Sequence, residues 1–250
     1  MPRADQLLVE RGLASSRSLA QRLIAAGVRW QTHNGVWQNV SKNGDVLPSD
    51  CKLELVDDSE SRYVSRGGLK LEGALQTTGL QVTGLRCLDV GQSTGGFTDV
   101  LLQNGAAHVT GVDVGQGQLH AKLQQDPRVR CIEKHNARTL SRELFAAEAL
   151  FDLAVADVSF ISLTLLIPAV LSVLTPSGLL LLLVKPQFEL QPEDIGKGGL
   201  VKDPAKYQDV ETRLRDCCAQ NGVEVLQWLP SPIAGGDGNR EFFMYGRRVS

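Results

Sequence analysis

The sequence predicts an α/β protein in which a mostly parallel sheet covered by helices follows a smaller α+β unit. Residues 63–250 alternate strictly between segments of strand length and helix length, which is typical of a parallel sheet covered on both faces. Within them, the apolar strand Arg86–Val90 leads into a glycine-rich turn, a helix and a second strand that stops at Asp113, which is half of a nucleotide-binding unit. Residues 1–56 follow another pattern, so we expect two domains joined by a polar linker at 57–62.

The composition is that of a globular protein with no strong overall charge. Of 250 residues, 42% are hydrophobic and 22% charged, and the net charge is −2, so any contact with nucleic acid requires a local basic patch. The five cysteines form no CxxC pair, which argues against a disulfide framework and a zinc site. This pattern leads us to expect no bound metal. The N-terminus lacks an apolar core of signal-peptide length, so we expect a cytoplasmic protein.

The first domain carries the pattern of two helices followed by a hairpin. Amphipathic helices are expected at 3–11 and 16–26, and strands at Val28–Gln31 and 36–38 flank an Asn-Gly turn signal. Residues 1–30 hold five arginines and only two acidic residues. The arginines form either a cationic face for a phosphate backbone or an ordinary solvated helical face.

The stretch RADQLLVERGLASSRSLAQRLIAAG resembles the RNA-binding domain first seen in ribosomal protein S-four, which has this two-helix pattern with Ser-Arg at the start of the second helix. The sequence departs from that family at VRWQTHNG, where the family usually has a VxVNG strand, and this leaves the register of the hairpin open. The resemblance implies RNA-binding roles for four arginines, namely Arg3, Arg11, Arg17 and Arg22.

The second domain is expected to open with a helix at 63–75, which carries Lys70. The helix after the glycine turn is expected to end near Asn104. The further expected helices span 139–147, 163–174 and 203–220, and the further expected strands span 128–133, 151–157, 179–185, 223–229 and 241–247.

An uncharged run at 158–184 has the length of a membrane span. Pro176 and Gly178 divide it into a piece of helix length and a piece of strand length. A buried helix followed by a fully covered parallel strand accounts for both pieces, since such strands are continuously apolar. We therefore expect no stable membrane insertion.

Charged residues stand where several predicted strands end. Ligands of open α/β sheets lie beyond the carboxyl ends of the parallel strands. Asp89, Asp113 and Asp157 belong to three such ends, and Lys185 follows a run of leucines whose dry surroundings favour the neutral amine. If the last strand is antiparallel, Glu241 begins at the same edge, so the sequence predicts a site there.

Three ligand classes can be tested against the glycine turn. Residues 91–95 match the G-x-S-x-G pattern of hydrolases with Ser93 as nucleophile, but that chemistry requires a histidine late in the chain, and the last one is His135. A dinucleotide fold requires G-x-G-x-x-G, whose middle glycine is replaced by Ser93. The third class is S-adenosylmethionine, with Asp113 on the ribose hydroxyls.

Eight motifs resemble the hemolysin-A (TlyA) family of ribosomal RNA 2'-O-methyltransferases, whose catalytic domain is similar to the FtsJ/RrmJ methyltransferase. They are YVSRGGLKL, LDVGQSTGGFTD, GVDVGQGQL, NAR, DVSFISL, VKPQFE, GKGGLVKD and SPIAGGDGNREF. The resemblance covers essentially the whole chain and implies a Rossmann-like class I methyltransferase fold, whose seven-stranded sheet is parallel except for its last strand. The chain departs from the family at Gln92, usually alanine, and at His120, usually aromatic.

The resemblance implies a catalytic tetrad of Lys70, Asp157, Lys185 and Glu241. The enzyme must align the methyl donor with a ribose 2'-hydroxyl and remove its proton. Lys185 is the candidate for general base or for stabilising the alkoxide, and Asp157 would orient it. Lys70 and Glu241 would hold the ribose and tune the charge.

The cofactor implied by the resemblance is S-adenosylmethionine. Asn136 of the NAR motif either faces the adenine or caps a turn. The candidate cofactor-binding residues are Asp89, Gly91, Ser93, Thr94, Gly95, Gly96, Phe97, Asp113, Asn136 and Asp157.

The resemblance thus implies methylation of a cytidine ribose in ribosomal RNA of the large subunit and, in some members, of the small subunit. The expected partners are ribosomal RNA and ribosomal subunits. One alternative is a membrane-active hemolysin, which the family's historical name and the uncharged run suggest. Another alternative is an RNA-binding protein on an inactive methyltransferase fold, against which the intact tetrad argues.

Overall fold

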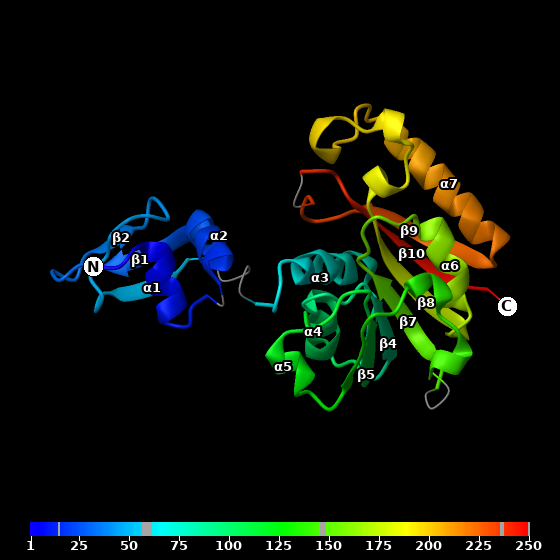
Figure 1. Ribbon diagram of the computed structural model, residues 1–250, viewed down its shortest axis with the longest axis horizontal. Helices are drawn as coiled ribbons and strands as arrows, with labels where there is room; N and C mark the ends of the chain where they lie inside the picture. Colours follow the sequence, from blue (N-terminus) through cyan, green and yellow to red (C-terminus); the bar gives the residue numbers. More distant parts are fainter. Residues whose placement is uncertain (15, 57–61, 146–148, 236–237, 250) are drawn as a thin grey trace. The chain divides into compact units, whose positions relative to one another are not determined.

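The computed structural model describes residues 1–14, 16–56, 62–145, 149–235 and 238–249. The chain forms two compact units, Met1–Arg66 and Gly67–Ser250 (Figure 1). Most of the linker predicted at 57–62 lies outside the described residues, because only residue 62 is described.

The first unit packs two helices on a small antiparallel sheet. Helix α2 begins after Ser16, whose side chain caps it by accepting a hydrogen bond from the backbone N–H of Leu19 (3.2 Å). The hairpin register is now fixed, with Trp30 opposite Gln38. A third strand, which the sequence did not predict, completes the sheet order β2-β1-β3. The elements are α1 (Ala4–Glu10), α2 (Arg17–Gly27), β1 (Val28–Gln31), β2 (Trp37–Asn39) and β3 (Lys52–Leu55).

The second unit is built on a seven-stranded sheet with the order β6-β5-β4-β7-β8-β10-β9. Strand β10 runs antiparallel to both of its neighbours, whereas the neighbouring strands from β6 to β8 pair in parallel, as predicted. The strands are β4 (Arg86–Val90), β5 (His108–Val112), β6 (Val129–Ile132), β7 (Phe151–Ala156), β8 (Leu174–Val184), β9 (Val223–Pro230) and β10 (Phe242–Arg248).

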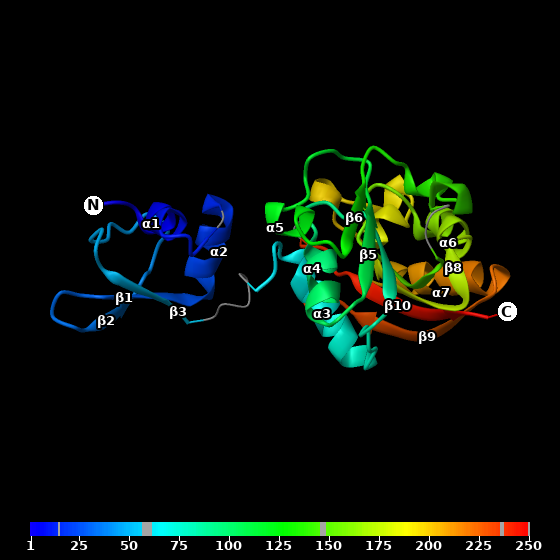
Figure 2. The same cartoon turned by 90° about the horizontal axis from the view of Figure 1, so that it is seen from below.

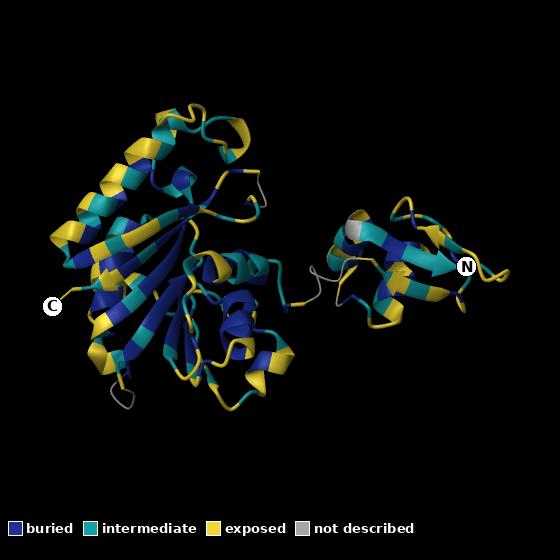
Figure 3. Cartoon of the chain, turned by 180° about the vertical axis from the view of Figure 1, so that it is seen from behind, coloured by how far each residue is buried: buried dark blue, intermediate teal, exposed yellow. Residues whose placement is uncertain are grey.

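Helices cover both faces of this sheet. Helices α3, α4 and α5 lie on one face, and α6 and α7 lie on the other (Figures 1 and 2). These helices are α3 (Gly67–Thr78), α4 (Gly96–Gln103), α5 (Ala121–Gln124), α6 (Leu163–Leu171) and α7 (Lys206–Gln220). The arrangement buries the central strands on both sides, as Figure 3 shows by the dark colour of those strands.

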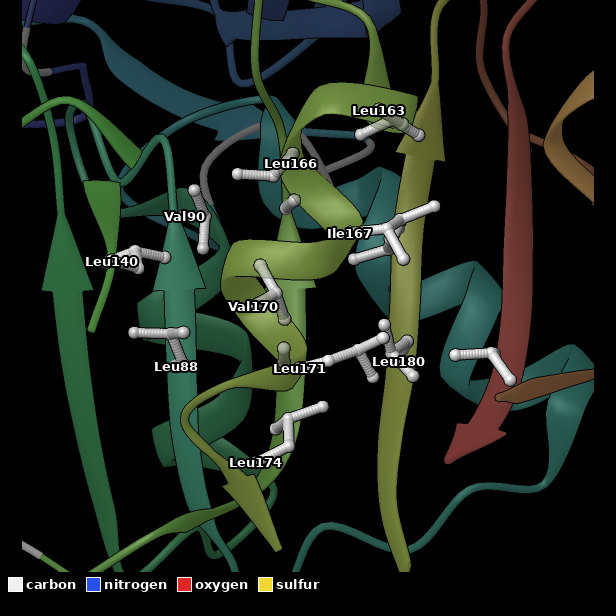
Figure 4. Close-up of a cluster of buried hydrophobic side chains, with 14 of the residues drawn as sticks. Leu88, Val90, Leu140, Leu163, Leu166, Ile167, Val170, Leu171, Leu174 and Leu180 are labelled. Carbon is white, nitrogen blue, oxygen red and sulfur yellow. The ribbon is translucent and has the colours of Figure 1, made fainter. Parts of the chain in front are cut away.

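The main core lies between the sheet and α6. Leu166, Ile167 and Val170 of α6 pack against Leu88 of β4 and Leu180 of β8 (Figure 4). The uncharged run at 158–184 therefore contains a buried helix and a covered strand, as the sequence predicted. Among the described residues, no helix combines the length and the apolarity needed to cross a membrane.

Several predicted boundaries were wrong for local reasons. The helix expected at 139–147 is replaced by the 3₁₀ turns Ala137–Thr139 and Arg142–Phe145, and residues 146–148 lie outside the described part. Helix α3 begins only at Gly67. Helix α7 begins at Lys206 and not at Asp203, whose side chain accepts from the backbone N–H of Ala205 (2.9 Å) in a turn that precedes the helix.

Replacing Leu182 by alanine tests how much of the stability depends on the covered strand β8. Leu182 is fully buried and lies between Ala156 of β7 and Met244 of β10. We expect Leu182→Ala to lower the free energy of unfolding by about 2–5 kcal/mol, because it leaves a cavity in a close-packed core. The control Leu226→Ala, on a residue that is 38% exposed, should lose about 1 kcal/mol or less. Urea denaturation measures both, and similar losses would contradict the prediction.

Candidate active site

The strand order brings charged residues from distant parts of the chain to one edge of the sheet. Strands β7 and β8 are parallel, so Asp157 and Lys185, which follow them, lie at the same edge. Strand β10 is antiparallel and pairs Phe242 with Val184. Glu241, just before Phe242, therefore stands beside Lys185.

The four residues of the predicted tetrad form two short ion pairs. Lys185 Nζ lies 2.6 Å from Asp157 Oδ1, and Lys70 Nζ of α3 lies 2.6 Å from Glu241 Oε2. Burial raises the pKa of Glu241, although Lys70 opposes this shift. The charges of Lys185 and Asp157 also act on Glu241, so the two pairs share one electrostatic environment.

Two aromatic rings beside the tetrad were not predicted as site residues. Phe160 is 90% exposed and has a backbone φ of +63°, a conformation that is strained for a residue with a side chain. Its ring lies 4.9 Å from that of Phe188. Between Asp157 and Phe160, Ser159 accepts a hydrogen bond from Lys185 Nζ (3.0 Å). The only signal for these rings in the sequence is their place within the DVSF and VKPQF motifs.

Glu189 holds the loop after Lys185 in place and was also missed by the sequence analysis. Its carboxylate accepts hydrogen bonds from Ser162 Oγ and from the backbone N–H of Leu163, both at 2.6 Å. Arg213 of α7 donates to its main-chain oxygen (2.5 Å). Glu189 therefore ties the loop that carries Lys185 to the first turn of α6, where a negative charge is favoured.

The glycine turn after β4 is shaped by close packing. Gly91 has φ +80°, and a Cβ atom there would lie 2.5 Å from the main-chain oxygen of Asp157. Gly95, with φ +96°, caps α4, and a Cβ atom on it would overlap Leu123. The turn thus packs directly against the loop that carries Asp157.

Two of the predicted cofactor residues, Gly96 and Phe97, are buried in the structure. Both residues open α4. The ring of Phe97 stacks on Phe243 of β10, with 6.2 Å between their centroids. Phe97 therefore contributes to packing, and a contact with a ligand would have to come from its backbone.

Asp113 joins the loops that follow β4 and β5. Its two carboxylate oxygens accept from the backbone N–H groups of Ser93 and Gly115, both at 2.7 Å. Ser93 Oγ also donates to Gln118 (3.1 Å), and the backbone N–H of His120 donates to the oxygen of Thr94 (3.1 Å). The predicted residues Ser93, Thr94 and Asp113 therefore lie together on one side of the edge.

Asp89 is a fully buried carboxyl group next to this turn. Thr98 Oγ1 donates to its Oδ2 (2.7 Å), and Gln92 donates in turn to Thr98 (2.9 Å). Its Oδ1 has no hydrogen-bond partner among the described residues. Burial raises the pKa of Asp89 to about 7, and the charges of Asp157 and Asp113 act in the same direction.

The predicted cofactor residue Asn136 has a structural role in the loop after β6. Asn136 caps the turn Ala137–Thr139 by accepting from the backbone of Arg138 (3.0 Å), which is one of its two expected roles.

Within the described ranges, no group of three or more histidine, cysteine, aspartate or glutamate residues is arranged to hold a metal ion.

The four candidate RNA-binding arginines of the first unit are not equivalent. Arg11 donates to the main-chain oxygens of Ser49 and Cys51 and so fastens α1 to the segment before β3. Arg22 donates to an oxygen of its own helix, at 3.4 Å. Arg3 and Arg17 both contact the buried carboxylate of Asp5.

Replacing Gly91 by alanine tests the close contact between the glycine turn and the Asp157 loop. Gly84→Ala is the matched control, because Gly84 also has a positive φ (+78°) but has no atom within 4 Å of a Cβ position. We expect Gly84→Ala to lower the free energy of unfolding by about 1 kcal/mol from backbone strain. Gly91→Ala adds overlap with a main-chain atom and should lose about 3 kcal/mol or more. Equal losses in chemical denaturation would show that the contact is unimportant.

Comparison with known proteins identifies the family. The model of the FtsJ-like methyltransferase family matches residues 63–248. The chain is 43% identical over 252 residues to a Mycobacterium tuberculosis protein named 16S/23S rRNA (cytidine-2'-O)-methyltransferase TlyA, covering 98% of this chain and 89% of the relative.

Solved structures agree with this assignment. A Streptococcus thermophilus protein that carries a hemolysin name is 41% identical, with a TM-score of 0.77, covering 99% of this chain and 88% of that protein. An S-adenosylmethionine-dependent methyltransferase from Mesorhizobium loti is 16% identical to this chain and has a TM-score of 0.51. The match covers 72% of this chain and 98% of that protein, so the two share the fold. Since the family model spans most of the chain and close relatives align along nearly all of it, the chain belongs to the FtsJ-like methyltransferase family.

Proposed function

We propose that this protein transfers a methyl group from S-adenosylmethionine to the ribose 2'-hydroxyl of a cytidine in ribosomal RNA. The observation that carries the proposal is the convergence of Lys70, Asp157, Lys185 and Glu241 in two ion pairs at the edge of the sheet. The relative named as a 16S/23S rRNA methyltransferase supports the choice of substrate. Ribosomal subunits in the cytoplasm are then the partners of the enzyme.

The residues beside the glycine turn fit the proposed cofactor, which carries positive charge on its sulfonium and ammonium groups. The buried Oδ1 of Asp89, which has no hydrogen-bond partner in the described part of the chain, and the carboxylate of Asp113 are acceptors of opposite charge. Gly91 and Gly95 leave the backbone of the turn without side chains, which permits a close approach. When bound, the cofactor supplies an activated methyl group, and Asp89, Gly91, Ser93, Thr94, Gly95 and Asp113 are the residues that would hold it.

The tetrad suits the stabilisation of a developing alkoxide. Lys185 Nζ lies 2.6 Å from Asp157 Oδ1 in an ion pair. An ammonium held in this way can donate a hydrogen bond to the 2'-oxygen as its charge develops. Ser159 and Asp157 fix the position of Lys185 Nζ, and the Lys70–Glu241 pair closes the other side of the site.

The exposure and position of Phe160 support a role for its ring in binding the target base. A ring that is 90% exposed and held in a strained backbone conformation next to the tetrad offers a stacking surface. Stacking on aromatic side chains is the usual way in which proteins hold bases that are not paired. A cytosine stacked there would bring its own ribose toward Lys185.

Lys185→Ala tests the reaction and the assigned mechanism. We expect methyl transfer to fall by about 100-fold or more, because the group that stabilises the alkoxide is lost, while cofactor binding is retained. The control Lys206→Ala removes an ordinary lysine that pairs with Asp194 and Asp209 of the surface.

The measurement is transfer of labelled methyl groups to 23S and 16S ribosomal RNA, followed by mapping of the 2'-O-methyl positions. A Lys185→Ala enzyme as active as the wild type would exclude the mechanism. Absence of transfer by the wild type on both RNAs would instead favour an RNA-binding protein with an inactive methyltransferase fold.

The pKa of Asp89 predicts a pH dependence of cofactor binding. Without a cofactor, the carboxyl group is half protonated at pH about 7. A cation beside Oδ1 favours the carboxylate and lowers this pKa, so binding releases a proton and becomes stronger as the pH rises toward 7. We expect the Kd to increase by up to about tenfold per pH unit below 7.

Calorimetry between pH 5.5 and 7 in buffers of different ionisation enthalpy measures both the affinity and the released proton. Asp89→Asn cannot ionise, so it should bind the cofactor more weakly and with a flat pH profile. Asp203→Asn, which alters an exposed turn, should keep the wild-type profile. A wild-type affinity that does not change with pH would contradict the prediction.

A further inference from the structure

We propose that the buried carboxylate of Asp5 is a positioning residue that holds Arg3 and Arg17 together as a paired phosphate-binding site on the first unit. The inference rests on the proposed RNA substrate and names the part of the first unit that would contact the RNA backbone. It separates Arg3 and Arg17 from the other arginines of the first unit by their geometry.

Donors from both helices converge on Asp5. The residue lies in the first turn of α1 and is completely buried. Arg3 donates to its two oxygens through Nε (3.1 Å) and Nη2 (3.3 Å), and Arg17 of α2 donates through Nη2 (2.9 Å). Gln21 adds a fourth contact at 3.4 Å. Arg3 and Arg17 hold the pKa of Asp5 well below its usual range, so the carboxylate stays ionised.

The two guanidinium groups remain accessible although they share a buried partner. The side chain of Arg3 is 47% exposed and that of Arg17 is 54% exposed. A guanidinium has five N–H donors, of which Arg3 directs two at Asp5 and Arg17 directs one. Each arginine therefore keeps donors for an outside acceptor. Two cations with one shared anion have a net charge of +1, which matches one phosphodiester group.

A shared carboxylate overcomes the repulsion between two neighbouring cations. Without Asp5, two guanidinium groups at the ends of flexible side chains would move apart and each would lose rotational freedom on binding. With Asp5 in place, the donors are already ordered before a phosphate arrives. Charge-assisted hydrogen bonds from arginine to phosphate are roughly twice as strong as hydrogen bonds between neutral groups.

Charge and geometry make opposite predictions for Asp5→Asn. Removal of one negative charge makes the first unit more basic, so an effect of charge alone would strengthen RNA binding. Loss of the carboxylate would weaken RNA binding, because Arg3 and Arg17 would no longer be held together. Glu10→Gln is the matched control, since Glu10 lies on the same helix and is exposed, so it changes the charge by the same amount without touching the pair.

The experiment measures binding of the full-length protein to 23S ribosomal RNA over a series of salt concentrations, with thermal unfolding of each variant as a check of folding. We expect Asp5→Asn to bind about fivefold to tenfold more weakly, the loss of one or two charge-assisted hydrogen bonds. Its salt dependence should decrease by about one phosphate contact. Glu10→Gln should bind as the wild type does, or more tightly. A folded Asp5→Asn protein that behaves like Glu10→Gln would overturn the proposal.

Arg17→Lys provides a second test that leaves Asp5 and the charge of the site in place. It keeps the charge but removes the planar set of donors, so we expect binding about fivefold weaker. Arg29→Lys is its control, because Arg29 lies on β1 and contacts Trp37 and Glu54 instead of Asp5. Equal binding by Arg17→Lys and Arg29→Lys would also overturn the proposal.

Methyl transfer separates this inference from the proposed function. If both hold, Asp5→Asn raises the KM for RNA and leaves kcat at saturating RNA unchanged. A wild-type protein that binds RNA but transfers no methyl group would refute the proposed function, while the comparison of binding by the variants would still decide the role of Asp5.

Discussion

The antiparallel pairing of β10 with β8 is the constraint on which the active site depends. The register that sets Phe242 opposite Val184 places Glu241 next to Lys185. A shift by one residue would turn every side chain of β10 to the other face of the sheet, so the buried residues Phe243 and Met244 would exchange faces. Phe243 stacks on Phe97 of α4 and Met244 lies in the main core, so such a shift would break both sets of contacts. The core therefore favours the observed register, and the site inherits its geometry from the core.

The charged edge can exist because the strands behind it are almost entirely apolar. Strands β7 and β8 end in residues that are fully buried, and the first polar groups are Asp157 and Lys185 at the rim. Taking two charges out of water costs more than one ion pair usually returns, so such a pair is poor evidence of stability. The tetrad is better understood as a polar group that the hydrophobic core holds in place, with Glu189 and Ser162 fixing the loop that carries Lys185.

The sequence predicted the strands from their hydrophobic pattern and the site residues that lie at strand ends. It did not predict the residues whose roles depend on contacts between distant loops. Asp157, Lys185 and Glu241 followed from the places where strands begin or end, whereas Lys70 lies on a helix and came only from the family resemblance. Glu189 and Phe160 could not be predicted, because their roles depend on how two loops meet. The 3₁₀ turns Ala137–Thr139 and Arg142–Phe145 lie where the composition predicted a helix, so helical composition alone did not decide the local structure.

Both units use a carboxylate to fix the position of a cation, and this explains why overall charge is a poor guide to the function of this protein. Asp157 pairs with Lys185 in the second unit, and Asp5 pairs with Arg3 and Arg17 in the first, and in the proposed roles each carboxylate orients its cations. Each carboxylate lowers the net charge, which is −2 for the whole chain, while it orders the donors that face a ligand. A count of charges alone suggests that these acidic residues weaken the binding of a polyanion. Their contacts with the cations indicate the opposite, because an ordered cation binds a phosphate or an alkoxide better than a mobile one.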